Sequence, residues 1–213
     1  MKITNSKKKF IYLISPNRIK SKFYKNLREV LSLNKTEFFQ LRLKNVSIKK
    51  KISVGKKIKK ICKIFKVKFL VNDDPVVAKK INADGCHLGQ KDINILKARK
   101  IISKKIIGIT CHNSIKLAKA AIKNKADYIA FGAFNSSKTK KVKYKANIKL
   151  INKAKKLTKI PIVAIGGIND KNYNKLLLNK VNFLAISGYI WNNKKLKPID
   201  AVKKLKWKLM QVK

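Results

Sequence analysis

Short apolar runs alternate with longer amphipathic segments along the whole chain. Each run is nearly continuous in apolar residues and stops at a polar cluster, as strands do when both faces of a parallel sheet are buried. The pattern predicts eight such strands, at residues 10–15, 37–43, 69–72, 85–88, 105–110, 127–132, 161–165 and 181–187.

The segments between these strands carry apolar residues at helical spacing. Ser114 is a predicted N-cap, and Asn169 or Asp170 is expected to cap the helix after the seventh strand. Besides that helix, the spacing predicts helices at residues 21–33, 47–66, 75–81, 93–102, 114–125, 147–157 and 198–209.

The eight strand–helix units follow one another without a linker or a low-complexity tail. This order predicts a (β/α)₈ TIM barrel, with residues 1–213 forming a single domain. An open doubly wound sheet is the alternative. It would leave the polar strand ends without a common centre, and no early GxGxxG motif is present.

Polar residues at the ends of the strands would gather at the mouth of such a barrel, where barrel enzymes place their active sites. The second strand is expected to alternate, with Gln40, Arg42 and Lys44 on one side. The long polar segment of residues 133–146 has the length of a functional loop. The residues expected at the mouth are Gln40, Arg42, Lys44, Asn72, Asp73, Asp92, Thr110, His112, Ser137, Thr139, Lys140, Gly166, Gly167 and Ser187.

Carboxylates are scarce and concentrated. The chain has nine acidic residues, and Asp73, Asp74, Asp84 and Asp92 all lie within residues 68–92. This concentration predicts a cation site, most simply for Mg²⁺, which prefers oxygen ligands. Helix capping is the competing interpretation for Asp73, Asp74 and Asp92. For the glycine pair at 166–167, an ordinary tight turn competes with an anion site.

The net charge of +46 is the strongest feature of the composition and first indicates a nucleic-acid partner. However, the charge is almost entirely lysine, is spread over every segment, and is not interleaved with aromatic residues. We therefore expect no nucleic acid, although a polyanion-binding surface stays open as an alternative.

The remaining features set broad limits. The three cysteines, Cys62, Cys86 and Cys111, are odd in number, have no CxxC spacing and lie in apolar context, so buried free thiols are expected. No apolar run approaches the roughly 20 residues of a membrane helix. The basic, then apolar N-terminus is expected to be the first strand, and the protein to be cytoplasmic. The sequence leaves the oligomeric state open.

These residues carry a resemblance to a known family. The chain resembles the thiamine phosphate synthase family of (β/α)₈ barrels over about residues 10–190. The matching pieces, in family order, are QLRLK (40–44), ND (72–73), ADGCHLGQKD (83–92), IGITCH (107–112), ADYIAFG (126–132), SKTK (137–140) and IPIVAIGGI (160–168).

The resemblance implies that 4-amino-5-hydroxymethyl-2-methylpyrimidine diphosphate and thiazole phosphate combine to give thiamine phosphate and diphosphate. It implies Asp73 and Asp92 as Mg²⁺ ligands, and Arg42, Lys44, Thr110 and Lys140 as the catalytic group. The contacts implied for the pyrimidine substrate are Gln40, Arg42, Lys44, Asn72, Thr110 and Lys140. Those implied for the thiazole phosphate are Ser137, Thr139, Gly167, Ile186 and Ser187.

The chain departs from the family pattern at several positions. Asp74 stands where arginine is usual, and Thr110 where serine is usual. The loop at residues 135–137 lacks the family's proline, and residues 179–183 replace a glycine-containing turn. Two other functions stay open: a thiazole tautomerase in which His112 transfers a proton, and a non-catalytic barrel that binds thiamine precursors or polyanions.

Overall fold

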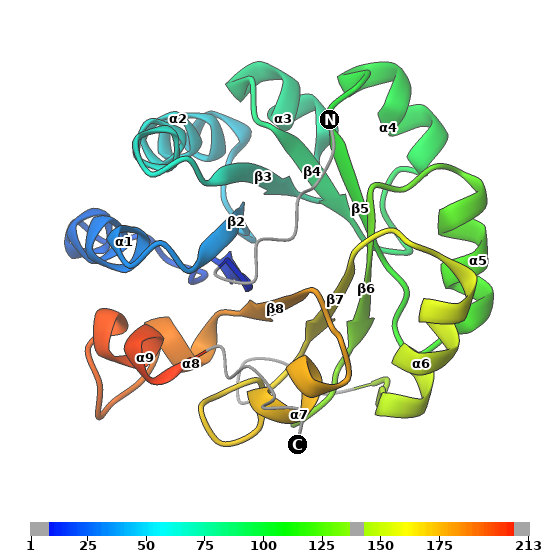
Figure 1. Ribbon diagram of the computed structural model, residues 1–213. Helices are drawn as coiled ribbons and strands as arrows, with labels where there is room; N and C mark the ends of the chain where they lie inside the picture. The colour runs from blue at the N-terminus through cyan, green and yellow to red at the C-terminus, as the bar shows by residue number, and fades with distance from the viewer. Residues whose placement is uncertain (1–8, 137–142, 207–213) are drawn as a thin grey trace.

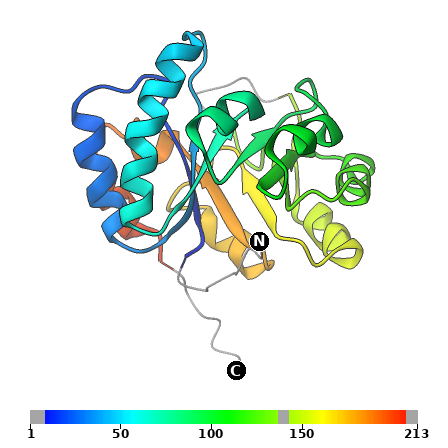
Figure 2. The same cartoon turned by 90° about the horizontal axis from the view of Figure 1, so that it is seen from above.

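The strands close into a barrel in chain order. The computed structural model describes residues 9–136 and 143–206. All neighbouring strands are parallel, and β1 pairs with both β2 and β8. Figures 1 and 2 show the helices arranged around the outside of the strands. The predicted (β/α)₈ barrel is therefore confirmed. The strands are β1 (Ile11–Ile14), β2 (Thr36–Leu41), β3 (Lys68–Asn72), β4 (Gly85–Leu88), β5 (Ile106–Thr110), β6 (Tyr128–Gly132), β7 (Ile162–Ile165) and β8 (Phe183–Ile186).

Helices follow the strands and present an apolar face to them. The helices are α1 (Lys22–Ser32), α2 (Ile48–Ile64), α3 (Pro75–Ile81), α4 (Ile95–Ile102), α5 (Ile115–Lys123), α6 (Ile148–Leu157), α7 (Tyr173–Leu178), α8 (Gly188–Trp191) and α9 (Pro198–Lys204). Ser114 caps α5 as predicted, because its side chain accepts from the Leu117 N–H at 3.2 Å. Within the described ranges, no helix is long and apolar enough to cross a membrane.

Two apolar cores result from the alternation of side chains along the strands. The larger core lies between the strands and the helices and includes all three cysteines, which are free and buried as expected. The smaller core fills the inside of the barrel with Tyr12, Ile14, Phe38, Leu70, Ile106, Tyr128, Ala130, Val163, Phe183 and Ala185. The interior is thus packed with side chains and is not a pore.

One arrangement recurs at the amino-terminal ends of the strands. Asp84 lies just before β4; its N–H donates to the Phe69 carbonyl at 2.8 Å and its Oδ2 accepts from the Phe69 N–H at 2.7 Å. Asp127 holds Ile107 in the same way before β6, and Asn182 holds Ile162 before β8. Asp84 therefore lies at the end of the barrel opposite to Asp73 and Asp92, although it was counted in the same acidic concentration of the sequence.

Several predicted boundaries differ from the structure. Strand β2 ends at Leu41, so Arg42 and Lys44 belong to the following loop rather than to one face of a strand. Helix α4 begins at Ile95 with Asn94 as its cap, not at residue 93. Neither Asn169 nor Asp170 caps α7, whose N-cap position is Asn172.

The last part of the chain was also predicted incompletely. The pattern missed α8, whose four residues are too few to show helical periodicity. Helix α9 ends at Lys204, with Leu205 as its C-cap, whereas the predicted helix continued to residue 209. Residues 207–209 lie outside the described residues.

Candidate active site at the barrel mouth

The carboxyl-terminal ends of the strands, with the loops that follow them, form the barrel mouth. Gln40, near the end of β2, is only 2% exposed. Its Nε2 donates to Asn72 Oδ1 at the end of β3, with 2.9 Å between the atoms. Two residues that were predicted to share a site are therefore in direct contact.

The two predicted metal ligands also meet. Burial raises the pKa of Asp92, and the interaction with the Asp73 side chain raises it further. The Gly89 N–H, which donates to Asp92 Oδ2 at 2.7 Å, and the Lys44 ammonium oppose this shift in pKa. Lys44 Nζ lies 3.4 Å from Asp73 Oδ2. We call Lys44, Asp73 and Asp92 the acidic cluster.

The backbone positions this cluster. Asp73 adopts a left-handed conformation with φ of 65°, and its N–H donates to the His87 carbonyl at 2.8 Å. Aspartate tolerates this region better than most non-glycine residues. The left-handed conformation turns the chain directly after β3.

The acidic cluster suits a magnesium ion. Two adjacent carboxylates repel each other, and a divalent cation relieves that repulsion. No group of three or more His, Cys, Asp or Glu side chains able to hold a metal occurs in residues 9–136 and 143–206. Two carboxylates are nevertheless enough for Mg²⁺, which completes its shell with water and substrate phosphates.

Asp74 has a different role from its neighbour. Its Oδ1 accepts from the Val77 N–H at 2.9 Å and so caps α3, which has a proline in its first turn. The capping interpretation is correct for Asp74, whereas Asp73 points to Lys44 and Asp92 caps no helix. The carboxylate at this position, where the family usually has arginine, thus caps helix α3.

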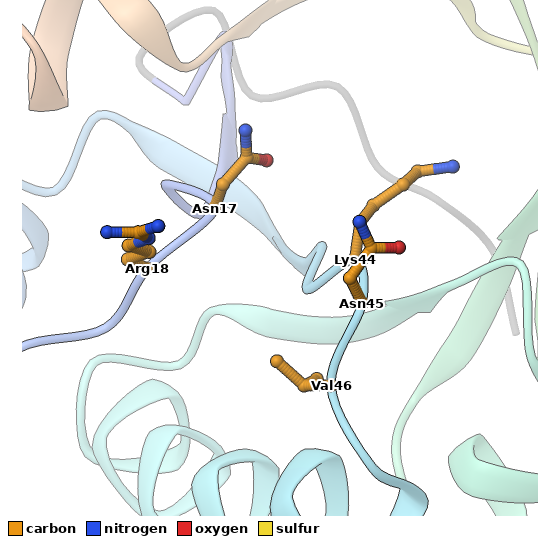
Figure 3. A pocket seen from close by; sticks show the side chains of 5 residues that line it. All are labelled: Asn17, Arg18, Lys44, Asn45 and Val46. Atoms are coloured by element: carbon orange, nitrogen blue, oxygen red, sulfur yellow. The ribbon is translucent and has the colours of Figure 1, made fainter.

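Arg42 is held at both its backbone and its side chain. Its N–H donates to Ser15 Oγ at 2.9 Å, and its guanidinium donates to Asn17 Oδ1 at 3.1 Å. Beside it, a pocket of ≈ 290 Å³ is lined by Asn17, Arg18, Lys44, Asn45 and Val46. Figure 3 shows the Arg18 and Lys44 side chains extending in different directions, so these two do not form one clamp.

The opposite side of the mouth is built on the glycine pair after β7. Gly166 and Gly167 both have positive φ, at 104° and 59°. A Cβ on Gly167 would come within 2.9 Å of the Asn135 carbonyl carbon and closer still to the Ser136 carbonyl oxygen. The pair therefore lets the loop after β6 pack directly on the end of β7, as the Asn135 N–H bond to the Gly166 carbonyl at 3.1 Å confirms.

Ile186 and Ser187 lie on the same side, at the end of β8. Ile186 is 2% exposed and belongs to the core between strands and helices, so its side chain is not available to a ligand. Ser187 Oγ donates to the Ser15 carbonyl at 3.1 Å. Ser137, Thr139 and Lys140 lie outside the described residues.

His112 follows β5 at the mouth. Its backbone has φ of 50°, and its ring stacks on Tyr144 with 4.3 Å between centroids. This stacking joins the loop after β5 to the segment before α6. His112 is the residue that the tautomerase alternative requires to be catalytic.

Sequence reasoning missed a line of polar side chains inside the barrel. The Tyr12 and Tyr128 hydroxyls are 2.7 Å apart, the Tyr128 hydroxyl is 2.8 Å from His87 Nδ1, and His87 Nε2 is 2.7 Å from Thr110 Oγ1. Burial lowers the pKa of His87 to about 4, partly opposed by Asp92, so the imidazole is neutral near neutral pH. We call these four residues the interior chain. The signal available in the sequence was a polar residue at an inward position of three apolar strands.

Comparisons with known proteins identify relatives of this chain. A family model described as thiamine monophosphate synthase matches residues 11–190. A thiamine-phosphate synthase from Pelagibacter ubique is 64% identical over 207 residues, covering 97% of this chain and 100% of that protein. One from Erythrobacter litoralis is 35% identical over 196 residues, covering 90% and 92%. The solved structure of thiamine phosphate pyrophosphorylase from Pyrococcus furiosus superimposes with a TM-score of 0.81 at 28% identity, covering 93% of each chain.

Proposed function

The chain belongs to the thiamine monophosphate synthase family, and we propose that its barrel mouth joins the pyrimidine diphosphate to thiazole phosphate in a Mg²⁺-dependent reaction. The products are thiamine phosphate and diphosphate. The observation that carries the proposal is the acidic cluster, because it combines paired carboxylates with the Lys44 ammonium at the barrel mouth.

The main chemical task is to stabilise a departing diphosphate. The bond from the pyrimidine methylene carbon to the diphosphate oxygen breaks, and the thiazole nitrogen forms the new carbon–nitrogen bond. Arg42 and Lys44 donate hydrogen bonds to the anionic oxygens and offset the charge that develops on them. Mg²⁺, when held by Asp73 and Asp92, neutralises part of the diphosphate charge.

The two amides at the ends of β2 and β3 suit the pyrimidine ring. Because Gln40 donates to Asn72 Oδ1, the remaining amide atoms are an acceptor on Gln40 and a donor on Asn72. An aminopyrimidine offers the matching donor and acceptor. We assign Gln40 and Asn72 to recognition of the ring, and Thr110 and Lys140 to its diphosphate.

The thiazole phosphate is assigned to the other side of the mouth. Backbone N–H groups at a glycine pair suit a phosphate, and late loops of barrels often hold one. We assign this role to Gly167, the Ile186 backbone and Ser187, together with Ser137 and Thr139. The thiazole nitrogen then faces the carbon from which diphosphate leaves, so that the reaction is one of positioning.

A product assay tests the proposal. Purified protein is given both substrates with Mg²⁺ or with excess chelator, and thiamine phosphate and diphosphate are measured. We expect both products only with Mg²⁺, and losses of at least about a hundredfold in Asp73→Asn and Asp92→Asn, because each removes a ligand charge.

Two matched controls accompany these variants. Asp74→Asn changes the adjacent carboxylate but keeps a capping side chain, and Asp200→Asn changes a carboxylate in the first turn of α9. Both should keep activity. Folded protein that makes no product under any metal condition would contradict the proposal. Metal-independent isomerisation of the thiazole, lost in His112→Gln, would favour the tautomerase instead.

The proposed partners are the two small-molecule substrates, in a cytoplasmic setting. Despite the net charge of +46, we propose no specific nucleic-acid partner. Duplex binding measured across a salt series tests this. Binding that persists at physiological salt with a preference for sequence or structure would contradict it.

A further inference from the structure

The interior chain crosses the barrel and ends at the mouth. It begins at Tyr12 on β1, passes through Tyr128 on β6 and His87 on β4, and ends at Thr110 on β5. Tyr12 is 1% exposed, Tyr128 0% and His87 8%. Thr110 is the final residue of β5 and is part-exposed. The interior chain therefore connects the closed centre of the barrel with the barrel mouth.

The hydrogen atoms in this chain have a definite direction. A neutral imidazole carries one N–H, so either His87 Nδ1 accepts from Tyr128 and Nε2 donates to Thr110, or both bonds run in the opposite sense. In the opposite sense, Tyr128 would donate to Tyr12, and the Tyr12 O–H would need another acceptor. Tyr128 is the only hydrogen-bond partner of the Tyr12 hydroxyl among the described residues.

An unpaired hydroxyl donor in an apolar interior is strongly unfavourable, whereas an unused acceptor lone pair costs less. Around Tyr12 the barrel interior is apolar, with the Phe38 ring at a centroid distance of 5.3 Å. A doubly protonated His87 would also donate to Tyr128 and would leave the Tyr12 hydrogen unpaired. Only one arrangement pairs every buried donor: Tyr12 donates to Tyr128, Tyr128 to His87, and His87 to Thr110.

This direction decides what Thr110 offers at the mouth. Its Oγ1 accepts from His87 Nε2–H, so its own hydrogen is left to donate outward. The bond from His87 also polarises the hydroxyl and makes it a stronger donor. The Asp73 N–H donates to the His87 carbonyl at 2.8 Å, so the end of β4 that carries His87 lies beside the acidic cluster.

We infer that Tyr12, Tyr128 and His87 are positioning residues that hold the Thr110 hydroxyl as an obligate hydrogen-bond donor to a diphosphate oxygen. The ligand class is an anion that only accepts hydrogen bonds. This inference rests on the proposed function for the identity of the diphosphate, but the direction of the chain does not depend on it.

The first test is spectroscopic and requires no variant of the interior chain. Two-bond nitrogen–proton NMR correlations on ¹⁵N-histidine protein distinguish the tautomers of an imidazole. The whole protein has two histidines, His87 and His112, and a His112→Gln variant assigns the signals. We expect His87 to be the Nε2–H tautomer at neutral pH. The Nδ1–H tautomer or an imidazolium would overturn the inference.

The second test is a double-mutant cycle on the synthase reaction. Thr110→Val removes the donor, and Thr110→Ser, which keeps the hydroxyl, should lose less activity than Thr110→Val. Tyr128→Phe should lower kcat/KM for the pyrimidine diphosphate roughly tenfold, as loss of a supporting hydrogen bond commonly does. In the Thr110→Val background, Tyr128→Phe should have no further effect, because it acts through Thr110.

A merely structural role for Tyr128 would instead lower activity by the same factor in both backgrounds, and that result would overturn the inference. Binding of inorganic diphosphate to the unaltered protein and to Thr110→Val, with Mg²⁺ present, is measured in parallel. Weaker binding by Thr110→Val is expected, and equal binding would count against the donor role. An inactive protein would defeat the proposed function, while the NMR and diphosphate results would still decide this inference.

Discussion

The Ser15 hydroxyl forms two hydrogen bonds with the backbone of Arg42. It accepts from the Arg42 N–H at 2.9 Å and donates to the Arg42 carbonyl at 3.3 Å. The Ser15 N–H donates to the Gln40 carbonyl, and the Ser15 carbonyl accepts from Ser187 Oγ. One buried residue therefore ties the end of β2, which we assign to the pyrimidine diphosphate, to the end of β8, which we assign to the thiazole phosphate.

We predict that Ser15→Ala lowers kcat/KM roughly tenfold to a hundredfold, because small displacements of positioning groups are costly. Ser15→Thr keeps the hydroxyl and should restore most of the activity. Steady-state kinetics with each substrate varied in turn measure the effect. Equal activity in Ser15→Ala and the unaltered protein would show that Arg42 is held sufficiently by Asn17 and its neighbours.

Asp74 should matter for stability and little for catalysis. Because its side chain caps α3, Asp74→Ala is expected to lower the free energy of unfolding by about 1 kcal/mol, and Asp74→Asn by much less. Denaturant unfolding measures both variants. A large loss of activity in folded Asp74→Asn would show instead that this carboxylate takes part in the acidic cluster.

A substitution at Gly167 should affect the thiazole phosphate more than the pyrimidine diphosphate. Its φ of 59° and the close approach of Asn135 and Ser136 leave no room for a side chain. Gly167→Ala is predicted to raise KM for thiazole phosphate severalfold and to lower the free energy of unfolding by about 1 kcal/mol or more. KM for the pyrimidine diphosphate serves as the internal control and should change little. An equal rise in both KM values would indicate general disruption of the mouth.

The buried thiols should be unreactive until the protein unfolds. Burial raises the pKa of Cys86 and of Cys111 from 9.0 to about 12. At a given pH below 9 the thiolate fraction is then about a thousandfold smaller than in an exposed cysteine. Alkylation at pH 8 should therefore be very slow in the folded protein and fast in denaturant.

The same shifts make stability depend on alkaline pH. A thiol whose pKa is raised on folding contributes stability that is complete below pH 9. As the pH rises from 9 towards 12, the unfolded chain loses the proton and the folded chain keeps it, so the free energy of unfolding should fall. Unfolding measured at pH 8 and pH 10.5, with Cys86→Ala and Cys111→Ala as controls, tests the sign. Stability that rises over this range would contradict it.

Much of the fold could be predicted from local pattern. Eight apolar runs that stop at polar clusters are enough to count the strands of a parallel barrel, and the residues after those runs are enough to expect Asp73 and Asp92 at one site. Boundaries were less predictable. Arg42 and Lys44 continue the alternation of β2, but the ladder with β3 ends at Leu41, and only the pairing partner decides that.

The four aspartates of residues 68–92 show the same limit. They are close in sequence, and a tally of carboxylates cannot tell them apart. Asp73 and Asp92 follow strands and reach the mouth, whereas Asp84 precedes a strand and binds the Phe69 backbone at the opposite end. Asp74 adjoins Asp73 but turns to the Val77 N–H.

By itself, then, the sequence determined the number and order of the strand–helix units, because hydrophobic periodicity is a local property of the chain. Only the tertiary structure decided which polar side chains meet inside it. Tyr12 and Tyr128 are separated by 116 residues, and they touch only because closure of the barrel brings β1 and β6 to opposite walls of one narrow interior. Contacts of that range depend on register and closure, which no segment of the chain carries alone.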